Sequence, residues 1–202
     1  MISTDTATRR ILQMARKAGM LRVRDLIRQG IHPENLRRLC QRGALVRVQR
    51  GLYALPGADV TAQHSLAEAS KLVPAGVVCL LSALRFHEMG TQSPHEIWMA
   101  LNPKASMPRP KMVPLRVVRF SGAALTEGIE QHKIEGVTVK VYSPAKTVAD
   151  CFKYRSKVGL DVALEALREC LKDRRASIDE LQRYAKIRGV AKIMRPYLEA
   201  LA

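Results

Sequence analysis

Residues 31–56 read IHPENLRRLCQRGALVRVQRGLYALP, and this stretch decides the fold of the N-terminal part of the chain. Pro33 suits the first turn of a helix, where the backbone N–H that proline lacks would have no partner. Leu36, Leu39 and Cys40 recur at helical spacing and form one apolar stripe. A glycine follows, as is common just beyond a helix C-terminus. The stretch therefore begins with a short amphipathic helix.

The second half of the same stretch predicts a β-hairpin. Two β-prone runs, 45–48 and 52–55, flank the short link Gln49-Arg50-Gly51. A glycine in a short link between two such runs is a hairpin signal. A helix followed by a small hairpin, with arginines on both, is typical of the end of a winged helix-turn-helix. By itself, the stretch is equally compatible with an ordinary amphipathic helix that has a solvated basic face.

Two shorter helical patterns precede this stretch. They cover Thr8–Ala18 and Met20–Gln29, and each is followed by a glycine. Three short helices, the last two joined by a tight glycine turn, match the helix-turn-helix arrangement. Together with the hairpin they predict an independent small domain over residues 1–57.

Positive charge is concentrated in the same segment. The chain has 34 Lys and Arg against 18 Asp and Glu, a net charge of +16. Residues 1–57 hold 12 of the basic and 3 of the acidic residues, so their net charge is +9, against +7 for the remaining residues. Such an excess indicates a polyanionic partner, most often nucleic acid. The alternative is that the charge only keeps the protein in solution.

The candidates for DNA contact lie opposite the apolar stripe, on the predicted wing, or at the start of the second helix. Arginine can pair with guanine, and glutamine or asparagine with adenine, in the major groove. The candidates are Arg38 and Gln41 for base edges; Arg37, Arg42 and Asn35 for the groove rim; Arg47 and Arg50 for phosphate or the minor groove; and, more weakly, Arg22 and Arg24 for phosphate.

Residues 58–202 predict a mixed α/β domain with a helical C-terminal end, so the expected fold class is α+β. The breaker cluster Pro56-Gly57-Ala58-Asp59 marks the boundary, and Thr61 is expected to cap the next helix. Residues 102–114 are too rich in proline for regular structure. The expected strands are 77–80, 96–101, 115–120, 129–134 and 137–142, and the expected helices are 61–73, 82–89, 144–155, 160–173, 177–187 and 190–200.

Patterns of enzyme chemistry are missing. His87-Glu88 and His95-Glu96 lack the spacing that places two metal ligands on one helical face. Asp150, one helical turn after Lys146, is interpreted as a surface or capping partner rather than an acid catalyst. We therefore expect a protein that is not an enzyme and uses no cofactor or metal. A nucleic-acid-processing enzyme is the weaker alternative.

Four widely spaced cysteines, each in an apolar context, indicate buried thiols in a reducing compartment. The N-terminus has no signal-peptide pattern, and no apolar run is long enough to span a membrane. We expect a cytoplasmic protein without a membrane partner.

Several short motifs, taken in order, resemble those of a known family. Arg50-Gly51-Leu52-Tyr53 is similar to an R-G-x-Y wing, and Leu81-Ser82-Ala83-Leu84 is followed by His87, Thr91-Gln92 and Pro94. The segment from Ser143 to Asp150 is similar to an S-P-x-K-T-x-x-D motif. Together these motifs resemble the AbiEi family, the antitoxin side of AbiE type IV toxin–antitoxin systems.

The resemblance implies a two-domain regulator. The N-terminal domain would bind inverted repeats upstream of its own operon and repress it. The C-terminal domain would neutralise a nucleotidyltransferase-like toxin of the AbiEii type, and physical contact between the two is not implied. Inverted repeats require two copies, either as monomers side by side or as a homodimer. The alternative is a stand-alone winged-helix regulator whose second domain binds a protein partner.

Overall fold

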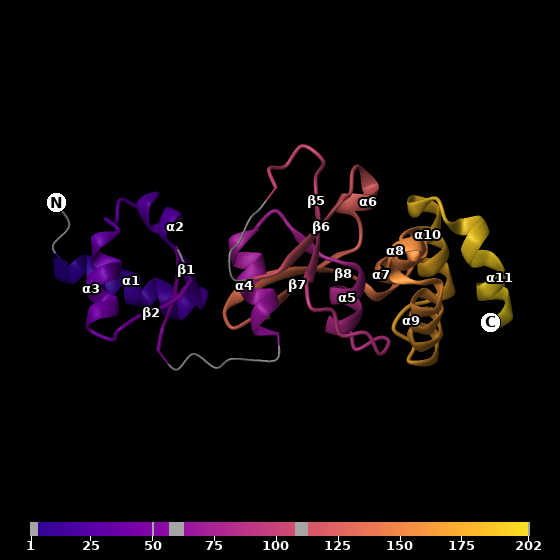
Figure 1. Cartoon of the computed structure of the whole chain (residues 1–202), viewed down its shortest axis with the longest axis horizontal. Helices are drawn as coiled ribbons and strands as arrows, with labels where there is room; N and C mark the ends of the chain where they lie inside the picture. Colours follow the sequence, from indigo (N-terminus) through magenta and orange to yellow (C-terminus); the bar gives the residue numbers. More distant parts are fainter. Residues whose placement is uncertain (1–3, 50, 57–62, 108–112, 202) are drawn as a thin grey trace. The chain divides into compact units, whose positions relative to one another are not determined.

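A computed structural model describes residues 4–49, 51–56, 63–107 and 113–201 and has an α+β fold (Figure 1). The chain forms two compact units. The first consists of residues 1–74 with 133–139, and the second of residues 75–132 with 140–202. The division into folding domains at residues 57 and 58 stays a prediction, because residues 57–62 lie outside the described part.

The first unit contains a winged helix-turn-helix. Its three antiparallel strands have the order β1-β3-β2, in which Leu21 pairs with Tyr53, and Arg47 pairs with Tyr53 from the other side. The helix–helix–helix–hairpin order expected from the sequence is therefore confirmed. The elements of this unit are α1 (Thr4–Ala18), β1 (Met20–Arg22), α2 (Val23–Ile27), α3 (Glu34–Gln41), β2 (Val46–Gln49), β3 (Leu52–Ala54) and α4 (His64–Leu72).

Two predictions for this unit need correction. The helix expected from Met20 starts only at Val23, because residues 20–22 form a strand on the free edge of β3. Pairing there gives the backbone of β3 hydrogen-bond partners on both sides. Helix α4 begins at His64 with Gln63 as its N-cap residue, whereas the predicted cap, Thr61, lies outside the described residues.

The apolar stripe of α3 faces the core of the winged helix-turn-helix. Leu36 and Leu39 are 1% and 3% exposed, and Cys40 is half-buried beside them. Burial of such a leucine side chain contributes about 1.5–3 kcal/mol. The opposite side of α3 is thereby fixed toward solvent. The core cluster consists of Ile11, Ala15, Leu21, Leu26, Ile31, Leu36, Leu39 and Leu45.

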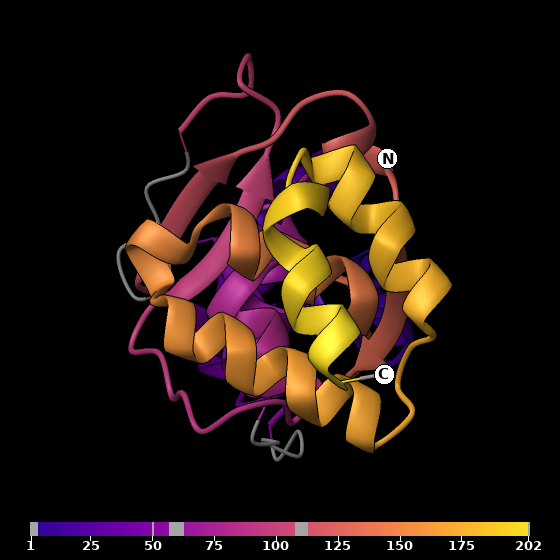
Figure 2. The same cartoon turned by 90° about the vertical axis from the view of Figure 1, so that its right-hand side faces the viewer.

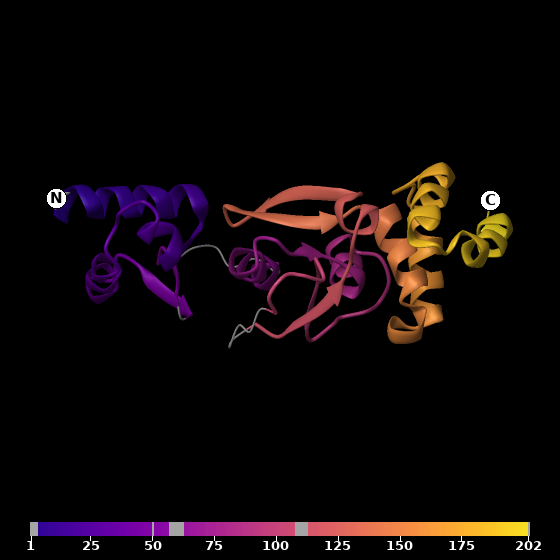
Figure 3. The same ribbon diagram turned by 90° about the horizontal axis from the view of Figure 1, so that it is seen from above.

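Residues 133–139 of the first unit are the turn end of a hairpin formed by β7 (Ile129–Ile134) and β8 (Val137–Tyr142) (Figure 3). Within this unit the backbones of Gly136 and Gly19 lie in close contact. A Cβ atom at Gly136, whose φ is +76°, would lie 2.8 Å from the Gly19 nitrogen. His64 Nδ1 lies 2.7 Å from Glu135 Oε2 beside them. Only glycine fits at position 136 without displacing backbone.

The second unit is built around a mixed five-stranded sheet of order β6-β5-β4-β8-β7. Strand β4 (Val77–Val78) is antiparallel to β5 (Ile97–Leu101) and parallel to β8. Strand β5 is also parallel to β6 (Leu115–Arg119). Every residue of β5 is buried, as is typical of a strand covered on both faces.

Helix α7 (Pro144–Lys153) is the centre of the helical part of this unit and contacts α5, α9, α10 and α11. Figure 2 shows the last three of these helices packed beside one another. The predicted capping box of α10 is confirmed, since Ser177 Oγ accepts from the Glu180 N–H at 3.2 Å and Glu180 accepts from the Ser177 N–H at 2.9 Å. The helices are α5 (Leu80–Phe86), α6 (Ala123–Thr126), α7, α8 (Arg155–Val158), α9 (Leu160–Lys172), α10 (Ile178–Arg188) and α11 (Ala191–Leu201).

The sequence missed the short helices α6 and α8 and predicted β4 too long. A four-residue helix shows barely one period of any apolar pattern, so its sequence carries little signal. The described residues of the proline-rich stretch 102–114, which exclude 108–112, contain no helix or strand, as expected. Across the described residues, none of the helices is both long and apolar enough to cross a lipid bilayer.

Candidate nucleic-acid interface

Local hydrogen bonds set the start and end of α3. The Glu34 N–H donates to His32 Nδ1 at 3.2 Å, and the Asn35 N–H donates to the His32 carbonyl at 3.1 Å. At the other end Gly43 has φ +67°, and the Ala44 N–H donates to the Leu39 carbonyl at 2.9 Å. A left-handed glycine at this place terminates a helix without steric cost. Helix α3 is therefore a short, well-defined rod.

The side of α3 opposite its apolar stripe is basic and exposed. Arg37, Arg38, Gln41 and Arg42 are all exposed to solvent, so the structure brings these four predicted residues together on one surface. Arg37 also forms a salt bridge with Glu34, 3.1 Å between Nε and Oε1, and this pairing was not predicted from the sequence. The surface offers several hydrogen-bond donors at spacings set by one helix.

Asn35 lies at the edge of this surface and is half-buried. Its side-chain amide donates to the His32 carbonyl at 3.2 Å, and this bond belongs to the first turn of the helix. Asn35 therefore contributes to the start of α3, and a DNA contact by its amide would have to replace or share this bond.

The wing carries one exposed candidate among the described residues. Arg47 extends from β2 and is exposed, next to Val46, which is 45% exposed. The register between β2 and β3 shifts between Arg47 and Gln49, and such an irregularity alters the local twist of a hairpin. The second wing candidate, Arg50, lies outside the described residues.

The two arginines at the start of the second helix differ in their surroundings. Arg24 is exposed, whereas the Arg22 side chain is only 14% exposed. Arg22 donates from Nε and Nη2 to both carboxylate oxygens of Asp25, at 2.8 and 2.9 Å. These hydrogen bonds hold the pKa of Asp25 below its usual value. Arg28, which follows α2 at the glycine turn, is exposed and was not singled out from the sequence.

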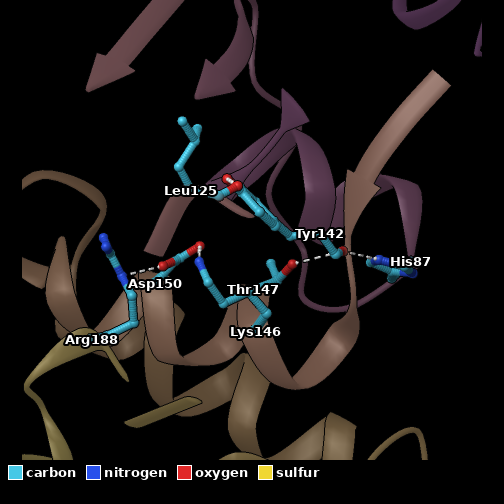
Figure 4. A network of polar contacts seen from close by, with 7 residues as sticks. All are labelled: His87, Leu125, Tyr142, Lys146, Thr147, Asp150 and Arg188. Carbon is cyan, nitrogen blue, oxygen red and sulfur yellow. Dashed lines mark hydrogen bonds and ion pairs between the residues drawn. The ribbon is translucent and has the colours of Figure 1, made fainter. Parts of the chain in front are cut away.

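The second unit contains a cluster of polar side chains, drawn in Figure 4, and Lys146, Asp150 and Arg188 in it are buried. Lys146 Nζ lies 2.6 Å from Asp150 Oδ2, and Arg188 Nε lies 2.5 Å from Asp150 Oδ1. The side chains of Lys146 and Asp150 are fully buried, and that of Arg188 is 8% exposed. Lys146 Nζ also lies 4.1 Å from the centre of the Tyr142 ring, within the range of a cation–π contact.

The Tyr142 carbonyl joins the same network, since it accepts from His87 Nε2 at 2.7 Å and from Thr147 Oγ1 at 3.1 Å. The Tyr142 hydroxyl donates to the Leu125 carbonyl at 2.8 Å. Residues of the S-P-x-K-T-x-x-D motif therefore connect β8, α7 and α10 inside the unit. The expectation that Asp150 is a surface or capping partner is wrong, because Arg188 covers it from another helix.

Burial dominates the electrostatics of this cluster. Desolvation raises the pKa of Asp150, although Lys146 and Arg188 oppose that shift, and desolvation lowers the pKa of Lys146. The cluster has two cations for one carboxylate, and of these three charged side chains Arg188, at 8%, is the most exposed. The cluster therefore links α7 to α10 through buried charges.

The four cysteines are all free thiols. Cys79, Cys151 and Cys170 are buried as predicted, and burial raises the pKa of Cys170 to about 11. Cys40 is only partly covered because it lies at the edge of the stripe on α3. A raised pKa keeps a thiol protonated and unreactive at neutral pH.

The geometry of residues 4–49 and 51–56 defines a winged helix-turn-helix with an exposed basic third helix. The family model described as "Transcriptional regulator, AbiEi antitoxin" matches residues 9–56. This match confirms, for that segment, the resemblance to AbiEi-type antitoxin regulators that the sequence motifs indicated. That description gives the family as one of transcriptional regulators and antitoxins.

A comparison with solved structures found similarity along nearly the whole chain. The crystal structure of the RV2827C protein from Mycobacterium tuberculosis matches with a TM-score of 0.57 and 18% identity, covering 96% of this chain and 81% of that one. At this identity the match shows a shared fold. No curated protein sequence matches the chain.

Proposed function

We propose that this protein is a sequence-specific DNA-binding repressor of its own promoter. The observation that carries the proposal is the exposed basic side of α3, fixed outward by the burial of Leu36 and Leu39. Recognition helices of helix-turn-helix proteins enter the major groove of DNA in this way. The family description of residues 9–56 supports the same function.

Within this proposal the exposed residues have different roles. Arg38 and Gln41, near the middle and end of α3, contact base edges, and Arg42 contacts the groove rim. Arg47 on the wing and Arg24 on α2 contact phosphate or the minor groove. Arg22 is the weakest candidate, because Asp25 already occupies its guanidinium.

The test is a binding titration of the full chain with a duplex from its own promoter and with an unrelated duplex. Arg38→Ala should reduce the preference for the promoter, because a good arginine–guanine pair contributes about 1–3 kcal/mol of discrimination. Arg47→Ala should weaken binding to both duplexes and reduce the slope of log K against log salt by about 0.9.

Arg168→Ala provides the matched control. Arg168 is an exposed arginine of α9, so this variant loses the same charge outside the candidate surface. If Arg37, Arg38 and Arg42 can be replaced together with no more effect than Arg168, the docking of α3 on DNA is refuted. The mass of the protein with and without promoter DNA distinguishes a homodimer from two monomers on inverted repeats.

We further propose that the protein acts as the antitoxin of a type IV system and neutralises a nucleotidyltransferase-like toxin. Support comes from the family description of the N-terminal segment. The experiment expresses the neighbouring reading frame with and without this chain and follows growth. Rescue of growth by a variant in which Arg37, Arg38 and Arg42 are all replaced by alanine, and which no longer binds the promoter, would separate neutralisation from repression. If the product of the neighbouring reading frame is not toxic under any condition, the alternative of a stand-alone regulator is favoured.

A further inference from the structure

The salt bridge between Glu34 and Arg37 places a hydrogen-bond acceptor beside a donor on the exposed side of α3. Glu34 Oε1 lies 3.1 Å from Arg37 Nε, and the two side chains are 43% and 71% exposed. The two residues lie about one helical turn apart, so the backbone itself holds them adjacent. Both groups remain accessible to a molecule that approaches this surface.

An acidic side chain at this place is unfavourable for general DNA binding. Residues 20–56 contain eight arginines and only two acids, Asp25 and Glu34. Asp25 pairs with Arg22 at the start of α2. Glu34 pairs with Arg37 and, unlike Asp25, lies on α3 itself. Phosphate groups repel a carboxylate, so Glu34 weakens any complex in which it meets only the DNA backbone. The carboxylate is compatible with a groove where a base donates a hydrogen bond to it.

One base pair in the major groove offers the complementary set of groups. The N4 amino group of cytosine is a donor, and O6 and N7 of guanine are acceptors. The salt bridge uses Nε of Arg37, which leaves Nη1 and Nη2 to donate to the two guanine acceptors. We propose that Glu34 and Arg37 together recognise a single C·G base pair, with Glu34 accepting from cytosine and Arg37 donating to guanine.

This inference rests on the proposed DNA-binding function and adds a specificity-determining pair to it. A T·A pair presents the O4 acceptor and the methyl group of thymine where cytosine has its amino group. The Glu34 carboxylate would face an acceptor there and lose its partner. One good pair of this kind corresponds to about 5- to 150-fold discrimination between the two base pairs.

The first experiment selects binding sites from a randomised duplex pool with the full chain and with Glu34→Gln. The wild-type protein should enrich sites with one invariant C·G position, and T·A at that position should weaken binding about 5- to 150-fold. In Glu34→Gln the same position should tolerate both pairs, and the affinity for unrelated DNA should rise because a negative charge is lost. Glu96→Gln is the matched control, since Glu96 forms an exposed salt bridge with Arg116 in the second unit.

The second experiment tests the arginine half of the pair. Replacing the guanine of that position by 7-deazaguanine removes the N7 acceptor, so it should weaken binding by the wild type and leave Arg37→Ala unaffected. Enriched sites whose base preferences are identical in wild type and Glu34→Gln would overturn the paired recognition while leaving the DNA-binding function intact. A pool from which the wild type enriches no sequence would overturn both.

Discussion

Replacing Asp150 by asparagine tests whether the buried cluster holds the second unit together. The substitution keeps the size of the side chain and removes the carboxylate that lies 2.6 Å from Lys146 and 2.5 Å from Arg188. Two cations then remain in a site where Lys146 is fully buried. Breaking a buried ion pair from one side costs about 3–5 kcal/mol, because the remaining charge is uncompensated.

The loss is measured by urea unfolding followed by circular dichroism, with thermal unfolding as a second readout. For a chain of this size each kcal/mol lowers Tm by about 2–4 °C, so Asp150→Asn should lower it by about 6–20 °C. Glu199→Gln is the control, since its pair with Arg195, at 3.8 Å, is exposed on both sides. An exposed pair of this kind contributes about 0–1 kcal/mol.

If Asp150→Asn and Glu199→Gln lose similar stability, the buried carboxylate does not hold the second unit together. A further variant separates charge from packing. Combining Asp150→Leu with Lys146→Met and Arg188→Met removes all three charges, and apolar replacement of a complete buried ion cluster is often neutral or stabilising. This triple variant should therefore be more stable than Asp150→Asn. If the triple variant is as unstable as Asp150→Asn, the loss of stability comes from the shape of the side chains and not from their charge.

Three further predictions follow from single contacts. Burial lowers the pKa of His87, so the folded protein favours the neutral imidazole. This contribution to stability is fully present above the unfolded pKa of about 6.5 and is lost as pH falls through the folded pKa. Between pH 7.5 and 5.5, His87→Gln should therefore lose less stability than the wild type, as measured by urea titrations at each pH. Ser177→Ala removes the N-cap of α10 and should cost about 1 kcal/mol in the same assay, against almost nothing for the exposed Ser156→Ala. Gly136→Ala should cost more than Gly43→Ala by urea unfolding, because both have positive φ but a Cβ atom meets backbone only at Gly136; equal losses would refute the close approach to Gly19.

Local patterns in the sequence were sufficient for the helices and the hairpin of the winged helix-turn-helix, but not for β1. The stripe on α3, the glycine turn of the wing and the helical period of α1 each involve residues close together in the chain. Strand β1 was missed because three residues carry too little periodicity, and its pairing partner β3 comes about thirty residues later. A strand that forms only by pairing with residues far away in the chain cannot be predicted from the apolar periodicity of its own residues.

The same limit applies to individual residues of the candidate site. The exposure of Arg38, Gln41 and Arg42 followed from helical geometry, whereas the pairing of Arg22 with Asp25 needed the actual side-chain conformations. The spacing of Lys146 and Asp150 is typical of a surface ion pair on a helix. Their burial depends on α10, which places Arg188 over Asp150, and no local pattern links these two positions.

The cluster of Lys146, Asp150 and Arg188 also constrains how this protein can diverge. A lineage that replaces the shared carboxylate first passes through an unstable intermediate, so the three positions should change in concert or not at all. Asp150 and Arg188 should therefore covary in an alignment of relatives. Such covariation would identify this arrangement of α7 and α10 even in chains whose overall sequence identity is too low to show it.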